Sequence, residues 1–165
     1  MSRYRKTRDL SRCDAAYIAG LIDGEGTITL SREHRSENRR LVVSIASTER
    51  CMLDFVAGQT GCGKITNKCT TSDRHTPSFA YRLTNRQALD LLAQVYPFLR
   101  SYKAARAALA VERYLAVTPR NGKYSLEMKK ARNDFETLFL AIVKGSELAT
   151  LRVIQLGAGE ASRRA

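Results

Sequence analysis

The sequence predicts an α+β fold in which helices cover one face of an antiparallel sheet and leave its other face open. Short stretches alternate polar with apolar side chains, longer stretches repeat apolar residues at helical spacing, and glycine or proline stands at most of the boundaries. The resulting order is helix, two strands, helix, two strands and helix, followed by C-terminal helices (αββαββα). With 165 residues, 44% of them hydrophobic, the chain is long enough for one ordinary core. We therefore expect a single domain over residues 1–165, with its core at about 10–117 and C-terminal helices at about 124–154.

The first part of the chain predicts one helix and one strand pair. Residues 14–24 are apolar at helical spacing and end in glycine, which is typical of a helix and its stop. Residues 27–35 and 41–47 alternate polar and apolar side chains, so they predict two strands. The charged loop at 37–40 joins these strands.

The second part repeats the pattern. Residues 49–58 predict a short helix with Thr48 as its N-cap, and residues 61–70 and 78–83 predict two further strands. Helical periodicity then continues almost to the C-terminus, interrupted by prolines. The three helices expected there cover residues 85–95, 103–117 and 124–143.

The charge of the chain indicates a polyanionic partner. The net charge is +12, and basic residues are spread along the whole sequence, so they belong to the folded body. A basic solubility tail or a patch that meets a membrane surface is the plainer alternative. No apolar stretch reaches the roughly 20 residues that cross a bilayer, and the N-terminus lacks the apolar segment of a signal peptide. We expect a soluble intracellular protein, from a bacterial cytoplasm or an organelle.

The cysteines do not form a recognisable framework. Four are present, without a CxxC pair, so reduced thiols are expected rather than a disulfide scaffold. Cys62, Cys69 and His75 offer a zinc site only on paper, because their spacing is not a recurrent one.

The open face of the predicted sheet is polar or basic at nearly every position. A solvated sheet face is the common explanation for such a pattern. The scarcity of acids favours a surface that faces DNA, because a two-stranded ribbon fits the major groove. Among these side chains Arg35, Arg40 and Lys68 are the strongest candidates to read bases. The expected DNA-binding residues are Thr29, Ser31, Arg35, Arg40, Ser44, Lys64, Thr66, Lys68 and Arg82.

The first helix carries small residues at every fourth position, Ala16, Gly20 and Gly24. Such a stripe lets another helix approach closely, either a core helix of the same chain or a second copy. Asp23 and Glu25 stand at the negative pole of this helix, which costs roughly 0.3–1 kcal/mol each. Two copies packed on their small faces would bring these carboxylates together, an arrangement that divalent cations relieve. Ligation by oxygen alone suits Mg²⁺.

Residues 18–26, IAGLIDGEG, resemble the nine-residue LAGLIDADG motif in character at every position. The order of elements also resembles the αββαββα fold of the LAGLIDADG homing endonucleases, over about the first 115 residues. Because one copy of the motif is present, the resemblance implies a homodimer. The interface residues that it implies are Ala16, Gly20, Asp23 and Gly24.

The resemblance also implies roles for individual residues. Glu25 is similar to the family's second acid, which ligates the catalytic metal, and Gly24 stands where a backbone carbonyl assists. Asp23 matches the first acid, which caps a helix or contacts the partner. Residues 97–107 resemble the segment whose lysine lies near the scissile phosphate, with Lys103 as the match after a one-residue insertion. The alternative for Lys103 is a surface lysine at a helix start.

Glu49 falls where relatives place a polar residue that orders water in the active site, so it is the third candidate catalytic residue beside Glu25 and Lys103. Its alternative is an acid favourably placed in the first turn of a helix, in which case Arg50 meets the phosphate instead. The two histidines, His34 and His75, fall in loops or at strand ends and are not expected to be catalytic.

The function implied is site-specific cleavage of double-stranded DNA, of the intron- or intein-homing type, at a long near-palindromic site with 3′ overhangs. The implied cofactor is Mg²⁺, with Mn²⁺ as a substitute. The alternatives are a LAGLIDADG maturase that acts on RNA, or a DNA-binding regulator, neither of which cuts DNA. A basic RNA-binding protein of the ribosomal kind leaves the stripe and its terminal acids unexplained.

Overall fold

The computed structural model describes residues 5–32, 34–35, 37–68, 76–120 and 122–146, and it confirms the α+β class and the order of its elements. The elements are α1 (Arg12–Glu25), β1 (Gly26–Ser31), β2 (Arg40–Ser47), α2 (Arg50–Thr60), β3 (Lys64–Asn67), β4 (Phe79–Thr84), α3 (Asn85–Val95), the 3₁₀ turn η1 (Tyr96–Phe98), α4 (Lys103–Arg113) and α5 (Leu126–Ala141).

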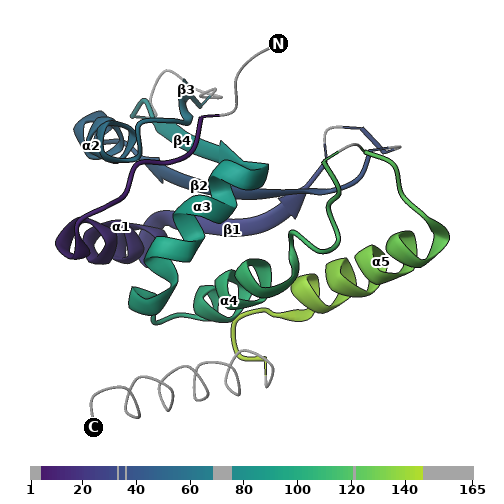
Figure 1. The fold of residues 1–165 in the computed structure, drawn as a ribbon. Coiled ribbons are helices and arrows are strands. Elements are labelled where there is room, and N and C mark those ends of the chain that lie inside the picture. The colour runs from purple at the N-terminus through teal and green to yellow at the C-terminus, as the bar shows by residue number, and fades with distance from the viewer. Residues whose placement is uncertain (1–4, 33, 36, 69–75, 121, 147–165) are drawn as a thin grey trace, which may run out of the picture.

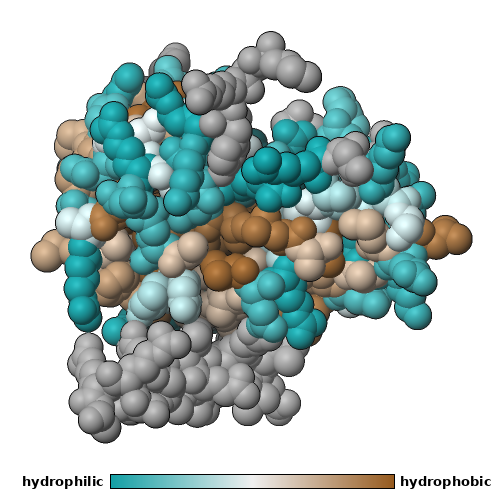
Figure 2. Space-filling model, in the orientation of Figure 1, coloured by the Kyte–Doolittle hydropathy of each residue, from teal (hydrophilic) through white to brown (hydrophobic). Residues whose placement is uncertain are grey.

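The four strands form one antiparallel sheet in the order β1-β2-β4-β3. In Figure 1, α3 crosses one face of this sheet, α2 lies on the side of β3 and β4, and α4 and α5 lie on the side of β1. Figure 2 shows the same helical side, where an apolar band runs between hydrophilic regions. The open face of the sheet is therefore on the far side of that view.

The core lies between the sheet and the helices. β1 and β4 bury alternate side chains, as the alternation predicts, whereas β2 buries Leu41, Val42 and Val43 in succession and β3 has no buried residue. α1 and α3 supply the opposing layer. Burying one such aliphatic side chain contributes about 1.5–3 kcal/mol. The largest fully buried side chains are Tyr81, Phe139, Ile18, Ile22, Ile28, Leu41, Ile45, Leu53, Leu83, Leu91, Leu92 and Leu109.

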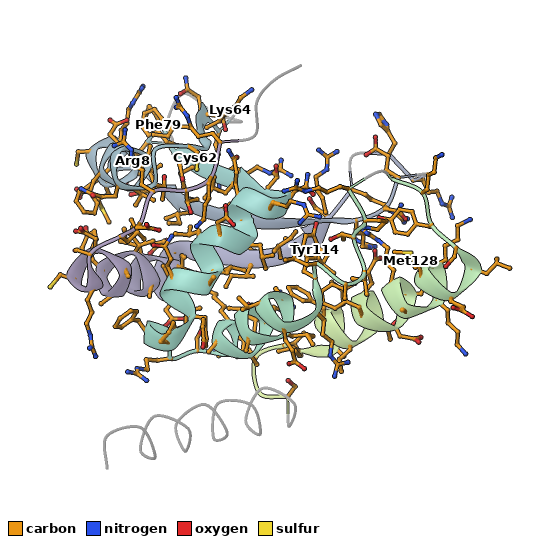
Figure 3. The ribbon with its side chains drawn as sticks, in the orientation of Figure 1. Arg8, Cys62, Lys64, Phe79, Tyr114 and Met128 are labelled. Atoms are coloured by element: carbon orange, nitrogen blue, oxygen red, sulfur yellow. The ribbon has the colours of Figure 1, made fainter. Side chains whose placement is uncertain are left out.

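The N-terminal segment crosses the helices and ties α2 to α3. The Arg8 amide donates to Thr60 O at 2.9 Å, and Gln94 Oε1 accepts from the Leu10 amide at 2.8 Å. The guanidinium groups of Arg5 and Arg8 donate to Gly61 O and Gly58 O at the C-terminal end of α2. Figure 3 shows Arg8 at this corner, near Cys62. These cations stabilise the negative pole of a helix that has no basic residue in its own last turn.

Two predicted boundaries in the first half are wrong. β1 ends at Ser31, not at residue 35, because β2 begins at Arg40 opposite Ser31 and later residues have no partner strand. Arg35 consequently lies in the loop between these strands. The N-cap of α2 is Glu49, not Thr48, because the helix begins at Arg50 and Glu49 before it has extended backbone, with φ of -90° and ψ of 97°.

Three further boundaries differ in the second half. β3 starts at Lys64 because Gly61 and Gly63 adopt φ of 67° and 90°, outside the strand region. α4 ends at Arg113 and loosens into a turn before Pro119, which disfavours helical backbone in the residue before it. α5 begins after Ser125, whose hydroxyl accepts from the Met128 amide. The expected helical residues beyond 146 lie outside the described part.

The proposed zinc ligands Cys69 and His75 also lie outside the described residues. In the described ranges the cysteines Cys13, Cys51 and Cys62 are free thiols. No helix in that part is both long and apolar enough to cross a bilayer.

Candidate functional site

The C-terminal end of α1 receives its positive charge from α4. α1 has no basic residue in its own last turn. Lys103 Nζ instead donates to Ile22 O at 2.8 Å and to Asp23 O at 2.9 Å, two carbonyls of that turn. Lys103 is only 7% exposed. Lys103 thus lies against the end of the motif helix, and it is buried and not a surface lysine.

Asp23 holds the segment that leads to Lys103. Its Oδ2 accepts from the Arg100 amide at 2.6 Å, and its Oδ1 accepts from the Ser101 amide at 3.3 Å and from the Ser101 hydroxyl at 2.5 Å. Ser101 Oγ in turn accepts from the Lys103 amide. Sequence reasoning missed Ser101; its only signal was a hydroxyl residue two positions before a helix start. The Asp23 carboxylate is a cap within its own chain.

Glu25 differs from Asp23 because its carboxylate is not engaged. The residue is exposed, and in the described part of the chain no hydrogen bond or ion pair involves its side chain. It lies close enough to Lys103 to influence that ammonium group. Burial lowers the pKa of Lys103, whereas the negative charges of Asp23 and Glu25 raise it. Glu25 is therefore an available oxygen ligand beside a buried cation.

The donor set at this end fits a hard divalent cation. Lys103 occupies the carbonyls of Ile22 and Asp23, which leaves the Glu25 carboxylate and the Gly24 carbonyl as oxygen donors. Among the described residues no group of three His, Cys, Asp or Glu side chains gathers at one point. One chain thus supplies one free carboxylate, and Mg²⁺ accepts such a site because it keeps several waters and takes phosphate oxygens.

The small-residue face of α1 has no partner in the described structure. Ala16, Gly20 and Gly24 are exposed, and a Cβ added at Gly20 or Gly24 would meet nothing within 4 Å. Tyr17 on the same face is 49% exposed. Gly26 is the contrast, since its Cβ would stand 2.6 Å from Ile22 Cα. The alternative in which a core helix of the same chain covers the stripe is therefore wrong for the described residues.

The open face of the sheet gathers most of the predicted DNA-binding residues. The register aligns Lys64, Arg82 and Ser44 across three strands, and Arg82 donates to Ser31 Oγ at 3.2 Å across the same face. Arg40 pairs with Glu37 at 3.2 Å. The predicted strand residues that share this face are Thr29, Ser31, Arg40, Ser44, Lys64, Thr66 and Arg82. Lys68 follows directly after β3, whereas Arg35 belongs to the loop after β1.

Glu49 is not brought into contact with Glu25 or Lys103 in the described structure. It is the exposed N-cap of α2, and its side chain makes no capping hydrogen bond. Arg50, the alternative phosphate ligand, pairs with Asp54 at 3.6 Å and lies over the ring of Phe79. The geometry joins Glu25 with Lys103, and it leaves the role of Glu49 as a prediction.

Comparisons with known proteins identify the family of the chain. A model of the LAGLIDADG-like domain matches residues 12–95. No curated protein sequence matches the chain.

Three solved structures illustrate the likeness in fold. The homing endonuclease I-CvuI in complex with its target superposes with a TM-score of 0.64 at 17% identity, over 88% of this chain and 96% of that chain. The archaeal intron-encoded homing endonuclease I-Vdi141I complexed with DNA gives 0.55 at 16% identity, over 87% and 94%. I-SmaMI bound to cleaved DNA gives 0.56 at 17% identity, over 92% of this chain but 50% of that chain. The chain belongs to the LAGLIDADG-like domain family and has the fold of its homing endonucleases.

Proposed function

We propose that this chain is a site-specific double-strand DNA endonuclease of the intron- or intein-homing type, which acts as a homodimer with a divalent metal ion. The observation that carries the proposal is the unengaged, exposed Glu25 carboxylate at the end of α1, beside the buried ammonium group of Lys103. The solved relatives I-CvuI and I-Vdi141I are both complexes with DNA, which supports the same class of substrate.

The dimer forms along α1. The exposed stripe of Ala16, Gly20 and Gly24 lets the backbones of two α1 helices approach closely, because these three positions carry no side chain larger than a methyl group. The end of each helix carries a Glu25, so this packing brings two carboxylates to one place. In the described part of the chain the Glu25 side chain has no hydrogen bond or ion pair, so two such carboxylates at one place attract a divalent cation.

DNA binds to the open face of the sheet. The row of Lys64 and Arg82 across β3 and β4 contributes phosphate contacts, which give affinity and register. Arg40, Lys68 and the loop residue Arg35 reach base edges, because their donors fit the acceptors of guanine. The net charge of +12 speeds the encounter with DNA.

The Glu25 carboxylate and the Gly24 carbonyl would hold the metal ion, in line with the I-CvuI complexes solved in the presence of Ca or of Mg. Bound Mg²⁺, or Mn²⁺ in its place, supplies acidified water and stabilises the departing oxygen. Lys103 places positive charge beside the phosphoryl oxygens, and Asp23 fixes the loop that carries Lys103. Glu49, at the start of α2, orients solvent in the site.

The test is cleavage of a randomised duplex DNA library by the purified protein with Mg²⁺ or with EDTA, followed by sequencing of the cut ends. We expect metal-dependent cutting at one near-palindromic site with 3′ overhangs. Binding to one site without cutting would indicate a regulator or a maturase instead. Absence of any selected site, together with a preference for RNA, would overturn the proposal.

A further inference from the structure

Strand β1 lies at the edge of the sheet, directly after the candidate site. It follows Glu25 directly, it carries Thr29 and Ser31 on the open face, and only β2 pairs with it. An edge strand exposes one row of backbone carbonyls that no other strand satisfies. Side chains from elsewhere in the fold supply donors to two carbonyls of β1.

The first donor is Arg106 of α4. Its NH1 donates to Ile28 O, and its Nε donates to Ile142 O at the end of α5, both at 2.8 Å. The side chain is 9% exposed, and its guanidinium lies 5.3 Å and 5.5 Å from the ring centroids of Tyr102 and Phe139. Arg106 thus joins β1 to α5 one helical turn after Lys103.

The second donor is Arg39, which α5 holds in place. Arg39 donates through NH1 to Leu30 O at 3.4 Å, and its Nε pairs with Glu136 at 3.7 Å. Glu136 also accepts from Arg132 Nε at 3.1 Å. Arg132 is 5% exposed and donates to Arg39 O. The loop between β1 and β2 is therefore anchored to α5 at its base.

Arg132 has further main-chain and side-chain partners that fix its orientation. It donates to Val117 O at 3.2 Å and to the Tyr124 hydroxyl at 2.7 Å, and its guanidinium lies over the Tyr124 ring. These contacts leave the forked guanidinium one orientation. A lysine has the same charge but lacks the planar fork, so it cannot donate hydrogen bonds in the same directions.

The two carbonyls that receive guanidinium donors, Ile28 O and Leu30 O, flank Thr29 and point to the same side of the strand because they are two residues apart. Burying guanidinium groups is costly, and apolar side chains would attach α5 at least as firmly. What directional donors add is a defined position of the strand along and across the sheet.

We propose that Arg39, Arg106, Arg132 and Glu136, which we call the β1 brace, are positioning residues through which α5 sets the placement of β1 and of the loop after it. The inference rests on the proposed function insofar as that placement decides which bases the hairpin of β1 and β2 prefers. None of the four residues touches the reacting atoms. α5 is in this account a specificity-determining element, although it lies outside the sheet.

The test compares Glu136→Gln with the wild-type protein and with Glu127→Gln. Glu136→Gln keeps the size and one acceptor but removes the charge that holds Arg39. Glu127→Gln makes the same chemical change on the same helix at an exposed position in its first turn, so it is the matched control. Arg106→Lys is a second variant, since one ammonium group cannot bridge Ile28 O and Ile142 O in the same geometry.

Two readouts are needed. The first is amide hydrogen exchange, for which we expect faster exchange in β1 and the following loop and unchanged exchange in β3 and β4. The second is selection from a randomised duplex library, for which we expect discrimination at the hairpin positions to fall about fivefold to tenfold, with kcat at saturating DNA within twofold of wild type. A purely stabilising role would instead raise exchange throughout the sheet and leave the selected bases unchanged.

The brace is overturned if Glu136→Gln and Arg106→Lys both leave local exchange and base selection as in Glu127→Gln. A wild-type protein that selects no DNA site contradicts the proposed function and with it the specificity role. In that case local exchange alone decides whether the brace positions the strand.

Discussion

The side chain of Lys103 has two roles. It satisfies two carbonyls at the end of α1, and it places a buried positive charge beside Glu25. The first role is structural and the second is electrostatic. A substitution at this position therefore affects both stability and turnover, and the two effects are separable by measurement.

Replacing Lys103 with methionine should lower the free energy of unfolding by about 1–3 kcal/mol, since a charged donor is lost from two carbonyls at a largely buried position. The rate of DNA cleavage should fall by at least about a hundredfold while the Kd for DNA changes little. Urea unfolding and single-turnover cleavage check the two effects. Lys129→Met, on exposed α5 surface, is the control for the loss of one positive charge. An unchanged cleavage rate would remove Lys103 from the mechanism.

Tyr81 should control the alkaline stability of the fold. Burial raises its pKa above the ordinary value, and its hydroxyl interacts with Thr60 Oγ1 at 2.7 Å and donates to Cys62 O at 3.0 Å. In the unfolded chain the phenol ionises above about pH 10, while in the fold it stays protonated. The stability from this group is fully present below pH 10 and is lost as pH rises toward the folded pKa, by up to about 1.4 kcal/mol per pH unit.

The Tyr81→Phe variant tests this expectation by denaturant unfolding between pH 7 and pH 11. It should be less stable by about 1 kcal/mol at pH 7, because the hydrogen bonds are lost, and its stability should fall less steeply above pH 10. A residual slope is expected from Tyr114, whose pKa burial also raises. Equal slopes in variant and wild type would show that Tyr81 does not carry the effect.

Candidate site residues could be named from the sequence where a motif contains them, but not where tertiary contacts decide which residues meet. The spacing in IAGLIDGEG singled out Glu25, and the likeness of residues 97–107 singled out Lys103. Neither pattern contains information on Ser101, which receives its role only because Asp23 lies opposite it in the fold.

Helix α1 is the element on which the proposed homodimer depends. Its exposed face is free of bulky side chains at Gly20 and Gly24, while Gly26 at its end is buried against Ile22. The glycines of this short stretch thus have opposite consequences. Gly20 and Gly24 leave space for a partner, whereas Gly26 permits close packing inside the chain.

Gly20→Leu should leave the monomer folded, with a gain of up to roughly 1 kcal/mol from helix propensity, and should abolish dimerisation and cleavage. Gly26→Ala should lower the free energy of unfolding by about 1–3 kcal/mol, because its Cβ clashes with the Ile22 backbone, and should leave the α1 interface unchanged. Sedimentation equilibrium and thermal unfolding separate the two. A dimeric, active Gly20→Leu variant would exclude α1 as the interface.

Element types were predictable from periodicity, whereas element ends depended on partners. The alternation in residues 27–35 predicts a strand to its end, but pairing with β2 stops at Ser31. A strand ends where its neighbour stops pairing with it. The alternation of side chains does not show which residue of the neighbour pairs first. The end of α4 was signalled by Pro119, yet the turn before it began earlier than the proline alone requires.

The two faces of the sheet differ in what covers them. Helices cover one side of the sheet (Figure 1), and the strand register aligns Lys64 with Arg82 on the other side. This arrangement predicts that DNA affinity depends steeply on salt, because each neutralised phosphate releases counterions.

Replacing both Lys64 and Arg82 with alanine should reduce the slope of log K against log salt by about 2, roughly one unit for each lost phosphate contact. Titrations of duplex DNA by fluorescence anisotropy at several salt concentrations measure the slope. Lys129 and Lys130 on α5, replaced together by alanine, remove the same charge from another element. Equal slopes for both double variants would show that the net charge, and not the open face, sets the dependence.

At this scale the order of elements and the open face followed from the sequence, because periodicity and turn residues act locally. The β1 brace did not, because Arg106 and Arg132 meet Ile28 O and Arg39 O only after α4 and α5 have packed beside β1. A basic residue in an amphipathic helix carries no sign of whether it faces solvent or a strand carbonyl.

Single-turnover cleavage of the selected DNA site by Glu25→Gln with Mg²⁺ measures whether the Glu25 carboxylate is the catalytic ligand. We expect the cleavage rate to fall by at least about 10³-fold, with the Kd for DNA within twofold of wild type, because glutamine keeps the size but loses the charge that holds the metal. Cleavage by Glu25→Gln within tenfold of wild type, at unchanged affinity, would contradict the account.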